Sequence, residues 1–291
     1  MNGPPAALAA RHGLTECGTR PGLAEYVRQL WGRRHFVLGF SRAQLHAQYS
    51  HARLGQWWQV ATPLLNAAVF YLIFGKLVGT GKGVPDFVPF LVTGVFVFAF
   101  TQSSVLGGTR SISGNLRLVQ SVHFPRASLP ISLCLTQLQQ MLYSMAVLVA
   151  IVLAWGERPC WAWLLALPAL LLQYVFTTGL ALVTARLGSR VPDLAQLMPF
   201  VLRTWMYGSG VMYSIDRLTA GGRAPGAVRW LLEVNPAAIH IDLMRFALID
   251  SFRASGHLPS HVWAWAVGWA VLVGVGGFVF FWKAEERYGR G

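Results

Sequence analysis

Apolar runs of about 20 residues recur along this chain and are its most restrictive feature. Such a run is long enough to cross the hydrocarbon core of a bilayer as a helix. Only 12% of the 291 residues are charged, against about 25% in an ordinary soluble protein, and the mean hydropathy is +0.47. Because a helix satisfies its own backbone hydrogen bonds in lipid, the sequence predicts an all-α integral membrane protein.

Six of these runs are predicted to be transmembrane helices. Aromatic residues cluster near their ends, as is typical of membrane interfaces. An even number of spans places both termini on the same side of the membrane. The predicted spans are Trp57–Phe74, Phe87–Leu106, Leu129–Trp155, Trp161–Ala185, Leu194–Tyr213 and Val262–Trp282.

Lys and Arg are unequally divided between the two sides of the membrane. The N-terminal region, the loop Arg110–Arg126, the turn after the fourth span and the C-terminal tail are rich in Arg. Because cytoplasmic loops are enriched in Lys and Arg, both termini are predicted to be cytoplasmic in a multi-pass protein of the cell membrane, the inner or plasma membrane. The same bias accounts for the formal net charge of +13. No nucleic-acid-binding motif accompanies this charge, so no nucleic-acid partner is expected.

The chain divides into three predicted parts. Residues 1–20 are expected to be disordered. Residues 21–56 are expected to form a cytoplasmic interfacial helix region, because one helical face carries Leu23, Val27, Leu30 and Trp31. An ordinary soluble helix remains an alternative for this region. Residues 57–291 form the predicted transmembrane domain.

The sequence carries no pattern typical of catalysis or of ion-driven transport. Every Asp and Glu lies outside the six predicted spans, whereas ion-coupled carriers place ionisable groups inside the membrane. Arg203 alone is charged within a span, where it is expected to face a polar cavity, a headgroup or a partner, or to snorkel to the cytoplasm. The stretch "GKLVGTGKGV" lacks the spacing of a phosphate-binding loop. We therefore predict a non-enzymatic transport or scaffold subunit with no cofactor or metal of its own, which takes its work from a partner.

A basic stretch, "NLRLVQSVHFPRASLPIS", separates the second and third predicted spans. Asn115–His123 is long enough for about two helical turns, and Pro125 ends them. On the predicted topology this short helix lies at the cytoplasmic face. The spacing of the residues fits a plain amphipathic loop as well as it fits this short helix.

A second interrupted segment, "APGAVRWLLEVNPAAIHIDLMRFALI", precedes the last span. Proline at position 236 disfavours one continuous helix. We predict two short helices that break at Asn235-Pro236 and dip into the outer leaflet, where protein or water must satisfy their polar groups.

The order of these motifs resembles the ABC-2 permeases that export polysaccharides such as O-antigen, capsule, teichoic acid and galactan. The resemblance runs from about Arg42 to the C-terminus. It includes "AQYSHARLGQWWQVATPLLNAAVFYLIFG", "SGNLRLVQSVHFPRASLPIS", "RVPDLAQLMPFVLRTWMYGSGVMYSID", "NPAAIHIDLMRFALI" and "FWKAEERYGRG". The chain departs from the family at Ala52-Arg53, where a serine is usual, and at Gly210, where a proline is usual.

The resemblance implies a homodimer that works with two copies of a separate ATPase, which would hold the ATP and Mg²⁺. The substrate would be a lipid-linked glycan moved outwards between the protomers, with membrane lipids around them. The implied channel residues, on the first and fifth spans, are Trp58, Phe70, Tyr71, Phe74, Arg203, Trp205, Tyr207 and Tyr213. The implied ATPase-coupling residues are Gly114, Asn115, Arg117, Val122, His123, Phe124, Pro125 and Arg126. The implied residues of the external gate are Asn235, Pro236 and Arg245.

Two alternatives stay open from the sequence. The same architecture serves exporters of small amphiphiles such as drugs or antibiotics, with a different substrate. An ion-driven carrier or a membrane-embedded enzyme is a different class, and the distribution of carboxylates argues against it.

Overall fold

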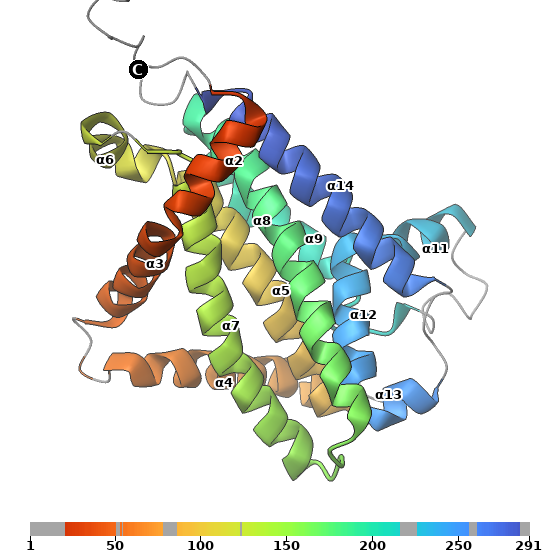
Figure 1. The fold of residues 1–291 in the computed structure, drawn as a ribbon. Helices are drawn as coiled ribbons and strands as arrows, with labels where there is room; N and C mark the ends of the chain where they lie inside the picture. The colour runs from red at the N-terminus through yellow and green to blue at the C-terminus, as the bar shows by residue number, and fades with distance from the viewer. Residues whose placement is uncertain are drawn as a thin grey trace, which may run out of the picture.

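A computed structural model describes residues 21–50, 53, 55–77, 86–122, 124–215, 226–255 and 261–285. Every regular element in these ranges is helical (Figure 1). The predicted all-α class is therefore confirmed for the described chain, whereas the predicted disorder of residues 1–20 lies outside it.

Five helical segments are long and apolar enough to cross a membrane, which supports a multi-pass membrane protein. All five match predicted spans, four of them with shifts of a few residues at their ends and the last without any shift. The five segments are Val60–Leu77, formed by α4 (Trp58–Phe70) and the π-helix η2 (Tyr71–Leu77); α5 (Phe87–Arg110); α7 (Ser128–Ala154); Trp161–Arg190, formed by η4 (Trp161–Leu165) and α8 (Ala166–Arg190); and α14 (Val262–Trp282).

The predicted span Leu194–Tyr213 is shorter in the structure. Its helix, α9, covers Leu194–Tyr207 and has 14 residues, which gives a length of about 21 Å against the roughly 30 Å of a bilayer core. The backbone then turns, and Gly210 takes a φ of 65°, a left-handed conformation that favours glycine. The described residues therefore do not confirm the predicted count of six spans.

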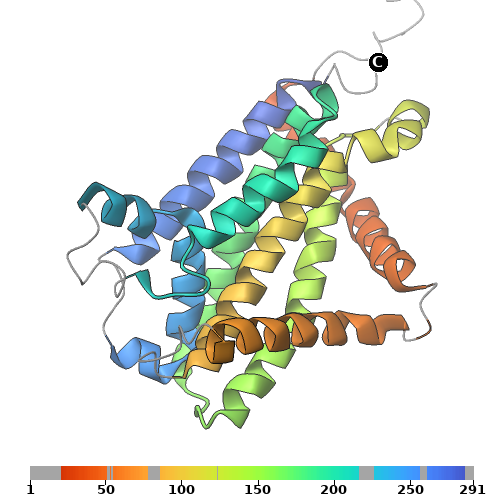
Figure 2. The same cartoon turned by 180° about the vertical axis from the view of Figure 1, so that it is seen from behind.

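The first span has an unexpected direction. Figures 1 and 2 show α4 lying across the long axes of α5 and α7 instead of running beside them. Several apolar side chains of this span are exposed, among them Leu65 and Val69 of α4 and Leu72 of η2. Length and composition, which are all that a hydropathy argument uses, do not specify this direction.

Helix α5 is the centre of the bundle and is buried along most of its length. It contacts α7, α8, α9 and the hairpin helix α12 (Pro236–Leu248). The most extensive helix pair is α8 with α14. Glycines permit its close approach, because a Cβ built on Gly179 would lie 2.2 Å from the carbonyl oxygen of Val273.

The region 21–56 forms two helices, α2 (Leu23–Gly32) and α3 (Arg34–Tyr49), followed by the short η1 (Gly55–Trp57). Leu23, Val27 and Trp31 of the predicted apolar face of α2 are exposed, and Leu30 is half-buried, so most of this face is available to lipid. Helix α3 instead packs along α7 through polar contacts. The Thr136 hydroxyl donates to the Ser41 carbonyl at 3.2 Å, and the Gln140 amide donates to Gln48 at 2.5 Å.

Both ends of the described chain meet at the end of the bundle that carries the short helix α6 (Leu116–Ser121) (Figure 1). The Trp282 indole N–H donates to the carbonyl oxygen of Pro21 at 3.0 Å. The remaining elements are η3 (Ser113–Asn115), α11 (Gly226–Glu233) and α13 (Asp250–Ala254).

Candidate functional site

The basic stretch between α5 and α7 contains a short projecting helix. The 3-10 turn η3 leads into the six residues of α6, and the backbone of Val122 is extended. Figure 1 shows α6 projecting from one end of the bundle. This agrees with the predicted helix, although the helix is shorter than the predicted Asn115–His123.

The outer surface of α6 mixes apolar and charged side chains. Leu116 is 44% exposed and Val122 is 49% exposed, and Gly114 and Arg117 are also exposed. Asn115 is directed back, since its side-chain amide donates to the carbonyl oxygen of Ser111 at 2.9 Å. Among the described residues of this segment, a partner would therefore meet the apolar Leu116 and Val122, polar side chains such as Gln120, and the cation Arg117.

The residues after α6 face the protein interior. Phe124 and Pro125 are buried, and the Phe124 ring lies 5.5 Å from that of Phe36 in α3. Arg126 is half-buried. The predicted coupling set therefore contains an exposed part and an anchoring part, while His123 lies outside the described residues.

The segment predicted to be an external hairpin breaks where the sequence predicts, with α11 ending at Glu233 and α12 beginning at Pro236. Asn235 caps α12 by accepting from the Ala237 N–H at 3.1 Å. It also accepts from the Trp205 indole at 2.9 Å and donates to the Gly208 carbonyl at 2.9 Å. One amide side chain thus joins the end of α9 to the start of α12.

Arg245 fixes the other end of α12 and is only 1% exposed. Its guanidinium lies 3.4 Å from the centre of the Phe90 ring and donates to the Phe90 carbonyl at 3.2 Å. It also donates to the Val211 carbonyl at 3.0 Å and pairs with Asp242 at 3.2 Å. The predicted gate residue is thus a buried clamp between α5, the turn after α9 and α12.

The implied channel aromatics do not meet in one place within a single chain. Phe70 and Phe74 stack on each other, with ring centres 6.0 Å apart. Tyr213 donates to the carbonyl oxygen of Tyr207 at 2.9 Å, and Tyr207 is exposed. Tyr71 and Trp205 pack against the main core, and Arg203 is exposed on α9.

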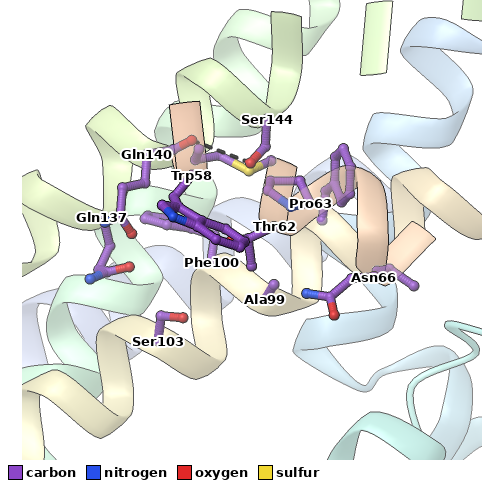
Figure 3. A pocket seen from close by; sticks show the side chains of 13 residues that line it. Trp58, Thr62, Pro63, Asn66, Ala99, Phe100, Ser103, Gln137, Gln140 and Ser144 are labelled. Carbon is purple, nitrogen blue, oxygen red and sulfur yellow. Dashed lines mark hydrogen bonds between the residues drawn. The ribbon is translucent and has the colours of Figure 1, made fainter. Parts of the chain in front are cut away.

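Trp58 does face a cavity, which has a volume of about 170 Å³ and lies between α4, α5 and α7. Figure 3 shows the polar side chains of the three helices around it. Each helix contributes a stripe at helical spacing, and no lining side chain is charged. The polar lining residues are Thr62, Asn66, Ser103, Gln137, Gln140 and Ser144, and the aromatic ones are Trp58, Phe96 and Phe100.

The cavity was not predicted from the sequence, although a signal was present. Gln137, Gln140 and Ser144 recur at intervals of three and four within an otherwise apolar run, which puts them on one face of α7. A polar face in a lipid-embedded helix indicates a partner or a hydrated space. Only the tertiary structure shows that Asn66 and Ser103 face the same space.

Within the described ranges, no group of three His, Cys, Asp or Glu side chains is placed to hold a metal ion.

Comparison with known proteins gives a consistent result. A family model described as ABC-2 type transporter matches residues 37–249. The chain is 28% identical over 195 residues to the O-antigen export system permease protein RfbA of Klebsiella pneumoniae, covering 67% of this chain and 72% of that protein. It is 28% identical over 210 residues to the protein of the same name from Myxococcus xanthus, covering 72% and 78% of the two chains.

Proposed function

Because the chain belongs to the ABC-2 type transporter family, we propose that it is the transmembrane subunit of an ATP-driven exporter of a lipid-linked polysaccharide. The relatives named above support a polysaccharide substrate, since both are O-antigen export permeases by name. ATP and Mg²⁺ would be bound by a separate ATPase, present in two copies.

The observation that carries the glycan proposal is the chemistry of the cavity between α4, α5 and α7. Amides and hydroxyls both donate and accept hydrogen bonds, so they match sugar hydroxyls. An indole such as that of Trp58 presents a flat apolar face to the C–H groups of a sugar ring. A lining without charge favours neutral polyhydroxyl groups over ions.

The proposed assembly is a homodimer with the channel between protomers. Helices α4 and α9, the implied channel helices, lie on the same side of the molecule (Figure 2). Both expose large apolar side chains, including Leu65 on α4 and Phe200 and Tyr207 on α9. A second copy facing this side would cover apolar surface and bring the aromatics of two chains together.

The proposed topology has both termini in the cytoplasm and six crossings, and it requires that α4, which lies across α5 and α7 in this structure, stand beside them in the membrane. In it, α9 and the turn after it complete the fifth crossing, and α11 with α12 forms a re-entrant hairpin at the outer leaflet. Residues 21–56 would lie at the cytoplasmic face, and residues 57–291 would form the ABC-2 domain. The meeting of Pro21 with Trp282 supports an even number of crossings.

The transport proposal is tested by reconstitution. Proteoliposomes that contain this chain and its ATPase are expected to move a lipid-linked glycan only when ATP is supplied. Movement of glycan by this chain alone, or movement that follows a proton gradient without ATP, would refute it.

Removing polar or aromatic groups from the cavity is expected to slow export. Gln137→Met keeps the length of the side chain and removes its amide. The loss of one hydrogen bond, worth about 0.5–1.5 kcal/mol, corresponds to a roughly 2- to 10-fold lower export rate. Trp58→Ala should act in the same direction, and Trp58→Phe, which retains a ring, is the control. The measurement is ATP-dependent glycan uptake, and unchanged uptake in both Gln137→Met and Trp58→Ala would remove the cavity from the substrate path.

Changing the exposed surface of α6 is expected to weaken ATPase docking. The double variant Leu116→Ala with Arg117→Glu alters two exposed side chains of α6. Because truncations at the centre of an interface cost about 1–2 kcal/mol of binding free energy, the ATPase is expected to associate roughly 5- to 30-fold more weakly. Gln120→Ala, also exposed on α6, is the matched control. Binding of the ATPase to liposomes containing each variant gives the result, and equal binding by all three proteins would contradict the docking assignment.

A further inference from the structure

Three segments that are far apart in the sequence meet at the end of the bundle that carries α6. They are Tyr26 of α2, the Arg126-Ala127 peptide just before α7, and Glu285 just after α14. The Tyr26 hydroxyl donates to one carboxylate oxygen of Glu285 at 2.8 Å, and the Arg126 backbone N–H donates to the other at 2.9 Å. The Ala127 N–H donates to the Tyr26 oxygen at 3.1 Å, and the Arg126 guanidinium donates to the Glu285 carbonyl oxygen.

This group is closed to solvent. Tyr26 is 1% exposed and Glu285 is 8% exposed. A buried carboxylate is costly unless it is hydrogen-bonded, and both oxygens of this one are. Burial raises the pKa of Glu285, while the bonds from the Arg126 N–H and the Tyr26 hydroxyl oppose the rise.

The two hydrogen-bonded N–H groups, those of Arg126 and Ala127, lie in the segment that joins α6 to α7. They follow the extended residue Val122 and the buried Phe124, and they precede the first turn of α7. Backbone N–H groups at a helix start lack partners within the helix, and the helix dipole favours a carboxylate there. Without Glu285 and Tyr26, the N–H groups of Arg126 and Ala127 would lose these acceptors.

Apolar packing surrounds the same point. Val119 of α6, Phe124, Tyr26 and Phe281 of α14 belong to one buried cluster. The Tyr26 ring also lies 5.9 Å from that of Phe278. The hydrogen-bonded group at the start of α7 is therefore enclosed by apolar side chains of α2, α14 and the α6–α7 segment.

We propose that Glu285 and Tyr26 form a joint that locks the start of α7 to α2 and α14, so that displacement of α6 moves these helices together and is not absorbed by the loop. Both are positioning residues, since neither lies on the exposed face of α6. The transmitting role rests on the proposed function, whereas the joint itself is a property of the single chain.

Hydrogen exchange of the purified full-length chain tests the joint without an ATPase. In Glu285→Ala, the amide of Arg126 is expected to exchange roughly tenfold faster, because its charged acceptor is lost. Tyr26→Phe should accelerate Ala127, whose acceptor is lost. Glu25→Ala removes an exposed carboxylate from α2 and should change neither amide. Retained protection in α8 and α14 shows that each variant is folded, and unchanged exchange in folded Glu285→Ala would overturn the joint.

The transmitting role is tested in the complex with the ATPase by counting glycan moved per ATP hydrolysed. Glu285→Ala is expected to lower this ratio severalfold while ATPase binding is retained, and Glu285→Gln, which keeps one acceptor oxygen, should restore part of it. A normal ratio in Glu285→Ala with fast exchange at Arg126 would overturn the transmitting role. If the wild-type complex moves no glycan, the proposed function fails, and the exchange measurement still decides the joint.

Discussion

Replacement of Arg245 by alanine is expected to destabilise the protein by about 3–5 kcal/mol, the usual cost of breaking a buried charged pair. The guanidinium is the hydrogen-bond donor to the carbonyls of Phe90 and Val211, and alanine would leave a space where it stacks on the Phe90 ring. The midpoint of thermal unfolding in detergent should fall by at least ~6 °C.

Arg253→Ala is the matched control for this prediction. Arg253 also pairs with an Asp three residues earlier on its helix, Asp250, and it also lies in the segment after α11. Its side chain is partly exposed, so its removal should cost about 0–1 kcal/mol. Equal shifts for Arg245→Ala and Arg253→Ala would show that Arg245 is not a clamp.

The second large effect is expected at the crossing of α8 and α14. A Cβ on Gly277 would lie 2.2 Å from the carbonyl oxygen of Gly179, well inside van der Waals contact. The opposing atom is backbone, so the two helices must move apart. Gly277→Ala is therefore expected to destabilise the chain by about 1–3 kcal/mol, the cost of an overpacked core.

The neighbouring Gly276 is the control for this crossing. A Cβ there would meet nothing within 4 Å, and alanine favours a helix by up to about 1 kcal/mol over glycine. Gly276→Ala should leave the thermal midpoint unchanged or raise it. The close crossing would be disproved if the two adjacent substitutions lowered the midpoint equally.

Helix positions were largely predictable because they depend on local properties. The run Val262–Trp282 is apolar throughout, and α14 has the same bounds. Asn235-Pro236 separates two helices because proline lacks the N–H that a continuous helix requires. A strictly local argument failed at the fifth predicted span, where α9 ends at Tyr207 and Asn235 binds the turn that follows.

The candidate sites were only partly predictable. Arg117 is exposed on α6, where a docking residue must be, whereas Phe124 of the same predicted set is buried. Sequence spacing could not separate the two, because a six-residue helix has no long apolar stripe. The Gln137–Ser144 stripe was visible in the sequence, but its facing residues on α4 and α5 were not.

The helical, membrane-embedded class and the resemblance to ABC-2 permeases could be read from the residues alone, because apolar length, scarcity of charge and motif order are properties of contiguous residues. The crosswise direction of α4, the burial of Arg245 and the meeting of Tyr26 with Glu285 are visible only in the folded chain. These depend on contacts between residues up to 259 positions apart. Such contacts are selected by packing and by satisfying buried polar groups, and no local pattern encodes them.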